Sequence, residues 1–287
     1  MRSKWLILIA FISVSAILSI TCYHDPRRFF AYISMGIIFG ITSVIVYYKR
    51  LEFMAAGITH AGFLSVVLGY LLEYYTGVNL YVYAVLMGLV IIYSAMMLIE
   101  KGFDPGKASA VLVSSTSALS VLISYYVLTS IPVRFSVSSI VFGDPLLITS
   151  GEVVLIISLA LVLLIATPFF IYELISTSID KVSASIAGVR VSLLNALAYT
   201  ILGLSVIALL RVSGYIMEHV MVLLPSITAV YYADNLREHV VSTILVSILA
   251  CSAGFSLSLI LGLSPTGTTG LVLITMFIIG YLLRSPR

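Results

Sequence analysis

Ten separate stretches of this 287-residue chain are each apolar enough and long enough to cross a lipid bilayer as a helix. A transmembrane helix needs about 20 mostly apolar residues. Hydrophobic residues make up 61% of the chain and charged residues only 9%, which excludes an ordinary soluble domain. The sequence therefore predicts an all-α polytopic membrane protein with eight to ten transmembrane helices, in a single transmembrane domain over residues 1–287. The stretches are 5–23, 29–48, 53–73, 80–99, 108–129, 152–172, 193–210, 214–232, 240–262 and 267–283.

The basic residues between these stretches predict the orientation in the membrane. If the N-terminus is cytoplasmic, eleven of the fifteen lysines and arginines fall on the cytoplasmic side, where such residues are enriched. Both termini are then predicted to be cytoplasmic. The net charge of +3 follows from this topology and does not indicate a nucleic-acid partner. The stretch 5–23 has no A-x-A cleavage site after it, so we interpret it as a retained helix and not as a signal peptide.

The chain lacks the motifs of an enzyme that would work inside or beside a membrane. It contains no G-x-x-x-x-G-K-[ST] phosphate loop, no dinucleotide-binding glycine pattern and no H-E-x-x-H zinc motif. We therefore expect neither ATP hydrolysis nor an intramembrane metalloenzyme, and no permanently bound cofactor. Uphill transport by this chain would need an ion gradient or a separate ATPase.

One segment on the predicted cytoplasmic side, residues 176–190, is too polar to enter lipid and too regular for a flexible linker. Ser178 can cap a helix there, and Asp180 in its first turn complements the helix dipole. Two interpretations are open, a docking surface for another protein and an interfacial helix that lies on the membrane. Four apolar residues recur at helical spacing and form one stripe: Ile179, Val182, Ile186 and Val189.

The same segment resembles a known family. Its pattern D-x-x-x-A-x-x-x-G, formed by Asp180, Ala184 and Gly188, resembles the coupling segment of permeases in ABC transporters that import zinc, manganese or iron(II). Further blocks resemble that family in the same order, and the similarity runs from about residue 29 to 283. These blocks are Thr59-His60-Ala61, Val141-Phe142-Gly143-Asp144, Leu223-Leu224-Pro225-Ser226-Ile227-Thr228-Ala229 and Ser264-Pro265-Thr266-Gly267.

The resemblance implies a set of partners and a location. It implies a homodimer, embedded among membrane lipids, with a cytoplasmic ABC ATPase docked on residues 178–190. Asp180, Ala184 and Gly188 would be the residues that couple to this ATPase. An extracytoplasmic metal-binding protein would deliver the ion, and the permease would be a multi-pass protein of the plasma membrane.

Three ionisable residues at membrane depth are candidate metal ligands: His60, Glu218 and His219. Such groups are costly in a bilayer and mark a pathway or a paired contact. The family commonly reads D-x-x-x-H, but Ala56 stands at the Asp position here, so Glu218 and His219 are the candidates that could replace the lost carboxylate. One carboxylate and two imidazoles suit zinc first and also accept manganese or iron(II). The other interpretations are a hydrogen-bonded structural histidine at 60 and a glutamate at 218 that reaches water at the outer interface.

Two other kinds of transporter remain open. A secondary transporter driven by protons or sodium would use Glu218, but it predicts an inverted repeat that the sequence does not show. An ABC permease for a chelated metal or a vitamin is kept open by Ala56. The longest outer loop, 130–151, is expected to form a turn and a short helix. It would act either as an outer gate or docking surface, or as a plain interfacial connector.

Overall fold

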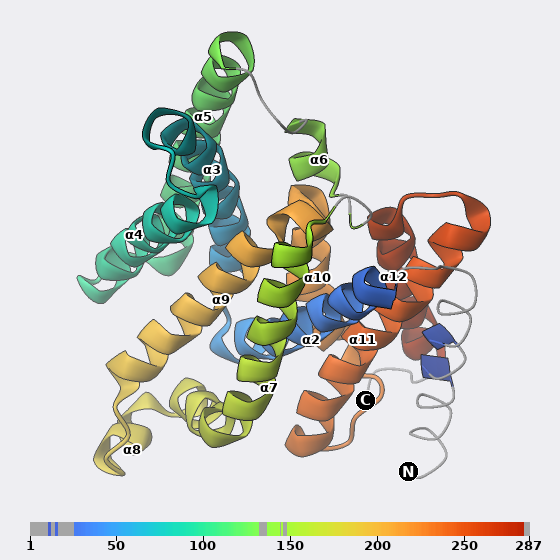
Figure 1. Ribbon diagram of the computed structural model, residues 1–287. Coiled ribbons are helices and arrows are strands. Elements are labelled where there is room, and N and C mark those ends of the chain that lie inside the picture. The colour runs from blue at the N-terminus through green and yellow to red at the C-terminus, as the bar shows by residue number, and fades with distance from the viewer. Residues whose placement is uncertain are drawn as a thin grey trace.

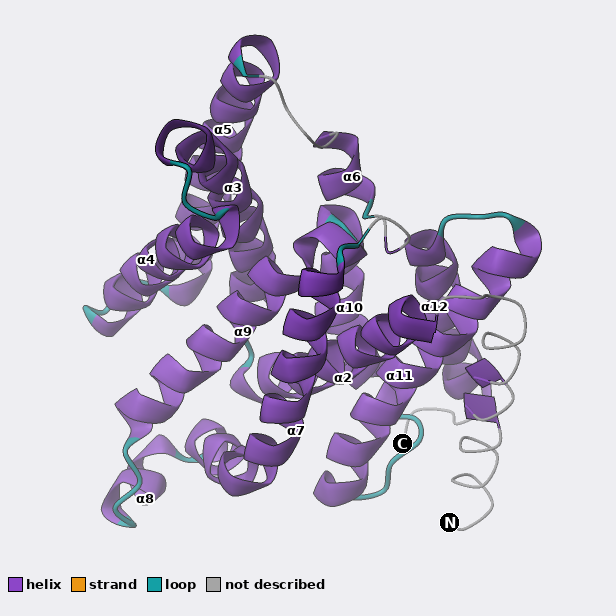
Figure 2. Ribbon diagram, viewed as in Figure 1, coloured by secondary structure: helices purple, strands orange, loops and turns teal. Residues whose placement is uncertain are grey.

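The computed structural model describes residues 11–12, 15–16, 26–131, 137–143, 145 and 148–283. Within these residues every regular element is a helix, so the predicted all-α fold is confirmed, and short loops join the helices (Figure 2). The helices are α2 Pro26–Lys49, α3 Glu52–Thr76, α4 Leu80–Glu100, α5 Pro105–Ser130, α6 Val137–Phe142, α7 Ser150–Ile179, α8 Lys181–Ile186, α9 Val191–Ser213, α10 Tyr215–Ala229, α11 Leu236–Leu261 and α12 Pro265–Leu283.

Eight of the helices in the described ranges are long and apolar enough to cross a membrane, namely α2–α5, α7, α9, α11 and α12. The predicted stretch 214–232 instead forms α10, which has only 15 residues. At 1.5 Å per residue it spans about 22 Å, less than the hydrocarbon core of about 30 Å. The stretch 5–23 lies almost entirely outside the described residues, so the tenth predicted helix stays a prediction.

Helix α2 lies in the middle of the molecule and packs against α7, α9, α10 and α11 (Figure 1). Its close contact with α11 depends on glycine, because a Cβ at Gly40 would lie 2.7 Å from the Cα of Ile244. Small residues permit such close packing of transmembrane helices, which gain little from the hydrophobic effect inside lipid. Helices α3, α4 and α5 form a second group, which joins the first through contacts of α3 and α4 with α9.

The two ends of the molecule differ in what they carry. Helix α8 lies at the lower end of the view in Figure 1, beyond the adjoining ends of α7 and α9, and α6 lies at the upper end. The short helix expected in the loop 130–151 is α6, and the backbone of its end packs on the corner between α9 and α10. Gly214 makes this corner with φ of 75°, and a Cβ there would overlap Phe142 and Gly143.

A buried ion pair near that upper end was not expected from the sequence. Arg211 of α9 donates from Nη1 to Oε1 of Glu152 over 2.6 Å, and the two side chains are only 12% and 7% exposed. Tyr81 of α4 donates to the same oxygen. Glu152 also completes a capping box with Thr149 at the start of α7. One carboxylate therefore links three helices, α4, α7 and α9.

We expect Glu152→Ala to destabilise the protein by about 3 kcal/mol, because Arg211 would remain buried without its carboxylate. Thermal unfolding of the full chain in detergent micelles measures this change. The matched control is Glu173→Ala near the other end of α7, where the glutamate is exposed. Equal stability of the two variants would show that the ion pair does not hold these helices together.

Candidate metal site

The structure brings two of the three predicted ligands together. His60 of α3 and His219 of α10 lie with ring centroids 5.6 Å apart and ring planes at 83°. Both side chains are half-buried, and both lie in the apolar interior that the transmembrane helices form. Two imidazoles at this separation can turn nitrogen lone pairs toward one ion between them.

A third ring, Tyr215, contacts both histidines. It stands one turn before His219 at the start of α10, so the two side chains share a face of the helix. The Tyr215 hydroxyl lies 2.8 Å from Nε2 and 2.9 Å from Nδ1 of His60. The Tyr215 carbonyl oxygen lies 3.0 Å from Nδ1 of His219. On its other side, His60 Nδ1 lies 2.8 Å from the Ser117 hydroxyl of α5.

These contacts determine which nitrogen of His219 can bind an ion. A carbonyl oxygen only accepts, so Nδ1 carries the proton and donates it to Tyr215 O, which leaves the lone pair on Nε2. The Thr59 hydroxyl lies 2.7 Å from that Nε2 and also 2.7 Å from the carbonyl oxygen of Ala56. The hydroxyl has one proton and two acceptors. It can therefore donate to Ala56 O when an ion takes the lone pair of His219.

Glu218 does not join the pair. Its side chain is fully buried, so the interpretation of a glutamate that reaches water at the outer interface is wrong. Its Oε1 accepts from the Ser213 hydroxyl over 3.2 Å, and its Oε2 has no hydrogen-bond partner among the described residues. Neighbouring residues on a helix point about 100° apart, which separates Glu218 from His219. No group of three or more His, Cys, Asp or Glu side chains that could hold a metal occurs in the described ranges.

The donors gathered at this place are thus two imidazoles and three hydroxyls, from Thr59, Ser117 and Tyr215. Imidazole nitrogen binds zinc, iron and other first-row metals, and neutral oxygen donors add weak ligands. With Ala56 one turn before His60, no carboxylate comes from that face of α3. Such a set can hold a divalent transition metal briefly, and brief binding is what passage through a transporter needs.

A further histidine, His239 of α11, lies away from this pair. It is buried, and its Nε2 lies 2.9 Å from the carbonyl oxygen of Ser226. Its Nδ1 lies 2.8 Å from the Tyr48 hydroxyl. Both ring nitrogens therefore have protein partners, and His239 connects the ends of α2, α10 and α11.

Helix α8 occupies the predicted coupling segment, and its cap differs from the expected one. Oδ1 of Asp180 accepts from the backbone N–H groups of Val182 (2.9 Å) and Ser183 (3.0 Å). Ser178, which the sequence indicated as the cap, instead donates to the carbonyl oxygen of Leu174 within α7. The hydroxyl and N–H of Ser183 lower the pKa of the Asp180 carboxyl below its ordinary value. The carboxylate is therefore charged at neutral pH, and the cap would be lost only as the pH falls through that lowered pKa.

Apolar side chains are exposed on and beside α8. Ile179, the last residue of α7, and Val182 and Ile186 of α8 are 79%, 68% and 83% exposed, whereas Ala184 is buried against the rest of the chain. Gly188 ends the segment with φ of 84° and open space around it. Three of the four residues of the predicted apolar stripe are thus exposed at the tip of the molecule, whereas the fourth, Val189, lies after α8 and is half-buried.

Comparison with known proteins identifies the family. The family model described as the ABC 3 transport family matches residues 26–284. The chain belongs to the ABC 3 transport family. This match covers the stretch over which the sequence resembles permeases of metal-importing ABC transporters, and it confirms that resemblance. The chain is therefore a multi-pass membrane subunit of the transport type.

Individual known proteins also align over most of this chain. The manganese transport system membrane protein MntC of Listeria monocytogenes is 24% identical over 261 residues, covering 89% of each protein. The manganese import system permease protein ScaB of Streptococcus parasanguinis is 26% identical over 256 residues, covering 86% of this chain and 87% of its own length. The solved structure of PsaBC from Streptococcus pneumoniae in complex with Fab superimposes with a TM-score of 0.79 at 19% identity, covering 95% of this chain and 96% of its own.

Three residues of the site in this ABC 3 protein escaped sequence reasoning: Thr59, Ser117 and Tyr215. Tyr215 carried a usable signal, since it stands four residues before His219 and therefore on the same helical face. Thr59 is adjacent to His60, but its hydroxyl reaches across to α10, which sequence spacing cannot show. Ser117 is one hydroxyl among many on α5 and carried no signal.

Proposed function

We propose that this chain is the permease subunit of an ATP-driven importer of a divalent transition metal, and that His60 and His219 hold the ion during its passage. The observation that carries this proposal is the imidazole pair, with centroids 5.6 Å apart, between two helices of a transport-family membrane protein. The names of the relatives support a metal as substrate. In this proposal Glu218 binds the ion only if α10 rotates about its own axis.

Two arguments about the transported metal favour different ions. The sequence favoured zinc, and two imidazoles agree with that choice. The relatives are named for manganese, which prefers oxygen ligands and would use the hydroxyls around the pair. Zinc is not confirmed, and we therefore propose manganese as the first ion to test, with zinc and iron(II) next.

The energy would come from a separate ABC ATPase docked on α8. The outward apolar surface of Ile179, Val182 and Ile186 supports this docking, because an apolar surface at the tip of a membrane protein is suited to a partner. Helix α8 stands in the loop between α7 and α9, on the side that carries Lys49, Lys101 and Lys107 and is predicted to be cytoplasmic. The N- and C-termini are proposed to lie on this side too.

The covalent path from α8 to the metal pair runs through a single helix, α9. Helix α9 follows α8 and runs to Ser213, and the single residue Gly214 joins it to α10, which carries Tyr215 and His219. A pull on α8 would move α9, and α9 would turn α10 about Gly214. His219 would then move relative to His60 on α3, and the ion would lose one imidazole. The complete importer is proposed as a homodimer of this chain, with two ATPases and an extracytoplasmic metal-binding protein.

One observation favours a second candidate, a secondary transporter. Glu218 is fully buried, and one of its oxygens has no hydrogen-bond partner in the part of the chain that the structure describes, so it could carry a coupling ion. A chelated metal or a vitamin as substrate stays a prediction based on Ala56 alone.

The test is uptake of radiolabelled manganese and zinc into proteoliposomes. The proteoliposomes contain this chain and its candidate ATPase, and the metal-binding protein is added to the external solution. We expect uptake that needs ATP, the ATPase and the binding protein together. Uptake that needs no ATPase but follows a pH gradient would contradict the proposal and would make Glu218 the centre of a secondary transporter.

A further inference from the structure

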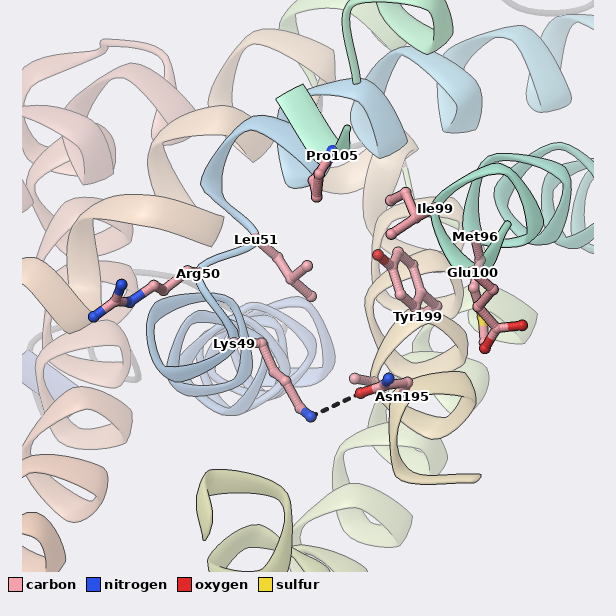
Figure 3. A pocket seen from close by; sticks show the side chains of 10 residues that line it. Lys49, Arg50, Leu51, Met96, Ile99, Glu100, Pro105, Asn195 and Tyr199 are labelled. Carbon is pink, nitrogen blue, oxygen red and sulfur yellow. Dashed lines mark hydrogen bonds between the residues drawn. The ribbon is translucent and has the colours of Figure 1, made fainter. Parts of the chain in front are cut away.

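A pocket of about 210 Å³ lies where the ends of α2, α4 and α9 meet the start of α3 (Figure 3). It is at the end of the molecule that carries α8, and none of its lining residues belongs to the metal pair. At about 30 Å³ per water-sized group, it has room for about seven such groups. Its lining is both charged and apolar and includes Lys49, Arg50, Leu51, Ile99, Glu100 and Asn195.

Lys49 gives the pocket an uncompensated positive charge. Its Nζ donates to Oγ1 of Thr177 and to Oδ1 of Asn195, each over 2.8 Å. Both partners are neutral, and an ammonium group has three protons, so one remains. In the ranges that the structure describes, no carboxylate lies within ion-pair distance of Lys49, and Lys181 adds a second positive charge within electrostatic range. A group with negative charge would therefore gain by entering the pocket beside Lys49.

The opposite wall carries a negative charge. Glu100, the last residue of α4, lies beyond Tyr199 in Figure 3, with its carboxylate directed away from Lys49. Among the described residues it accepts one long hydrogen bond, 3.4 Å from the Ser192 hydroxyl. The rest of the lining combines the apolar side chains of Leu51 and Ile99 with the polar groups of Asn195 and Tyr199. A ligand that fits both ends has a negative and a positive group and tolerates a partly apolar wall.

Membrane phospholipids present these groups at this depth. The pocket lies at helix ends, where a bilayer places its headgroups, and basic pockets between transmembrane helices on the cytoplasmic side bind lipid headgroups. We propose that the pocket binds the headgroup of a phospholipid with a primary ammonium, such as phosphatidylethanolamine. Its phosphate lies at Lys49, with Arg50 at the rim, and its ammonium lies at Glu100.

The lipid would affect the segment that α8 belongs to. Lys49 now connects α2 to Thr177 near the end of α7 and to Asn195 in the second turn of α9, which are the two helices on either side of α8. A phosphate at Lys49 accepts the remaining ammonium proton and draws Nζ toward the pocket. Occupancy of the pocket therefore changes how firmly α8 is held to α2.

The proposal can be tested by native mass spectrometry of the full chain in detergent, titrated with phosphatidylethanolamine or with phosphatidylcholine, which has the same phosphate but no N–H donor. We expect ethanolamine lipid to bind more tightly than choline lipid, and Lys49→Gln to weaken its binding by about fivefold. Lys49→Arg should keep the binding, and Glu100→Gln should remove the preference between the two lipids. Arg237→Gln, an exposed change on the same side but outside the pocket, should bind like the unchanged protein.

Three results would overturn the proposal. They are unchanged binding in Lys49→Gln, an equal loss in Arg237→Gln, and equal binding of the two lipids by the unchanged protein. Soluble phosphoethanolamine that displaces the lipid at equal concentration would overturn the assignment to a lipid. The unfolding temperature of each variant shows whether a loss of binding comes from a loss of fold, and Glu100→Gln tests the pocket without touching Lys49.

Discussion

His60→Ala should lower the affinity of the purified chain for manganese or zinc by at least about 100-fold. Loss of a residue that merely orients a metal ligand costs 10- to 100-fold in affinity, so loss of one of two imidazole ligands should cost at least the upper value. His219→Ala should have the same effect, because each imidazole supplies half of the nitrogen donors. Equilibrium dialysis with metal analysis, on the full chain in detergent, measures the affinity without any partner protein.

The chain offers a matched control for this result. His239→Ala removes an imidazole of the same kind, but both ring nitrogens of His239 are hydrogen-bonded to protein, away from the pair. Its metal affinity should equal that of the unchanged protein. An equal loss in all three variants would place the effect in stability and not in ligation. The prediction that Glu218 is a third metal ligand is tested by Glu218→Gln. A loss of metal affinity in this variant would show that the carboxylate reaches the ion in another conformation.

The helices of this protein could be predicted from hydropathy, because lipid requires long apolar segments with internally bonded backbones. The exception, α10, shows the limit of that argument. Its stretch is apolar over 19 positions, 214–232, yet the helix stops at Ala229 and a turn follows. Hydropathy measures how well a residue tolerates an apolar environment. Around α10 the neighbouring helices supply that environment as well as lipid, so an apolar stretch there need not be a helix that spans the membrane.

The sequence could predict the candidate ligands of the site but not which of them meet. Ionisable residues at membrane depth are rare, so His60, Glu218 and His219 were conspicuous in the sequence. Which of them meet depends on how α3 and α10 are rotated about their own axes, and that rotation comes from packing. The same applies to Glu152 and Arg211. They are 59 residues apart in the sequence, and only the fold brings Nη1 of Arg211 within 2.6 Å of Oε1 of Glu152.

Asp180→Arg should abolish ATP-driven uptake while leaving metal affinity unchanged. Arginine cannot accept the two backbone N–H groups that Asp180 caps, so α8 would lose its start, and an opposite charge would stand at the positive end of its dipole. The metal pair lies on other helices and keeps its geometry. Asp180→Asn is the matched control, because asparagine caps a helix about as well as aspartate and should retain most of the uptake.

A second pair of variants tests the surface of α8 and not its cap. Ile186→Asp places a charge on the outward apolar stripe, where Ile186 is 83% exposed, and should prevent the ATPase from docking. Ser185→Asp places the same charge on a neighbouring exposed residue outside the stripe and should still allow docking. Co-purification of the ATPase with each variant measures docking, and dialysis measures metal affinity in the same samples.

If Ile186→Asp retains the ATPase, the stripe rests on the membrane and α8 is an interfacial helix. If docking and metal affinity fall together, the two sites are not separate, and α8 supports the fold of the metal pair.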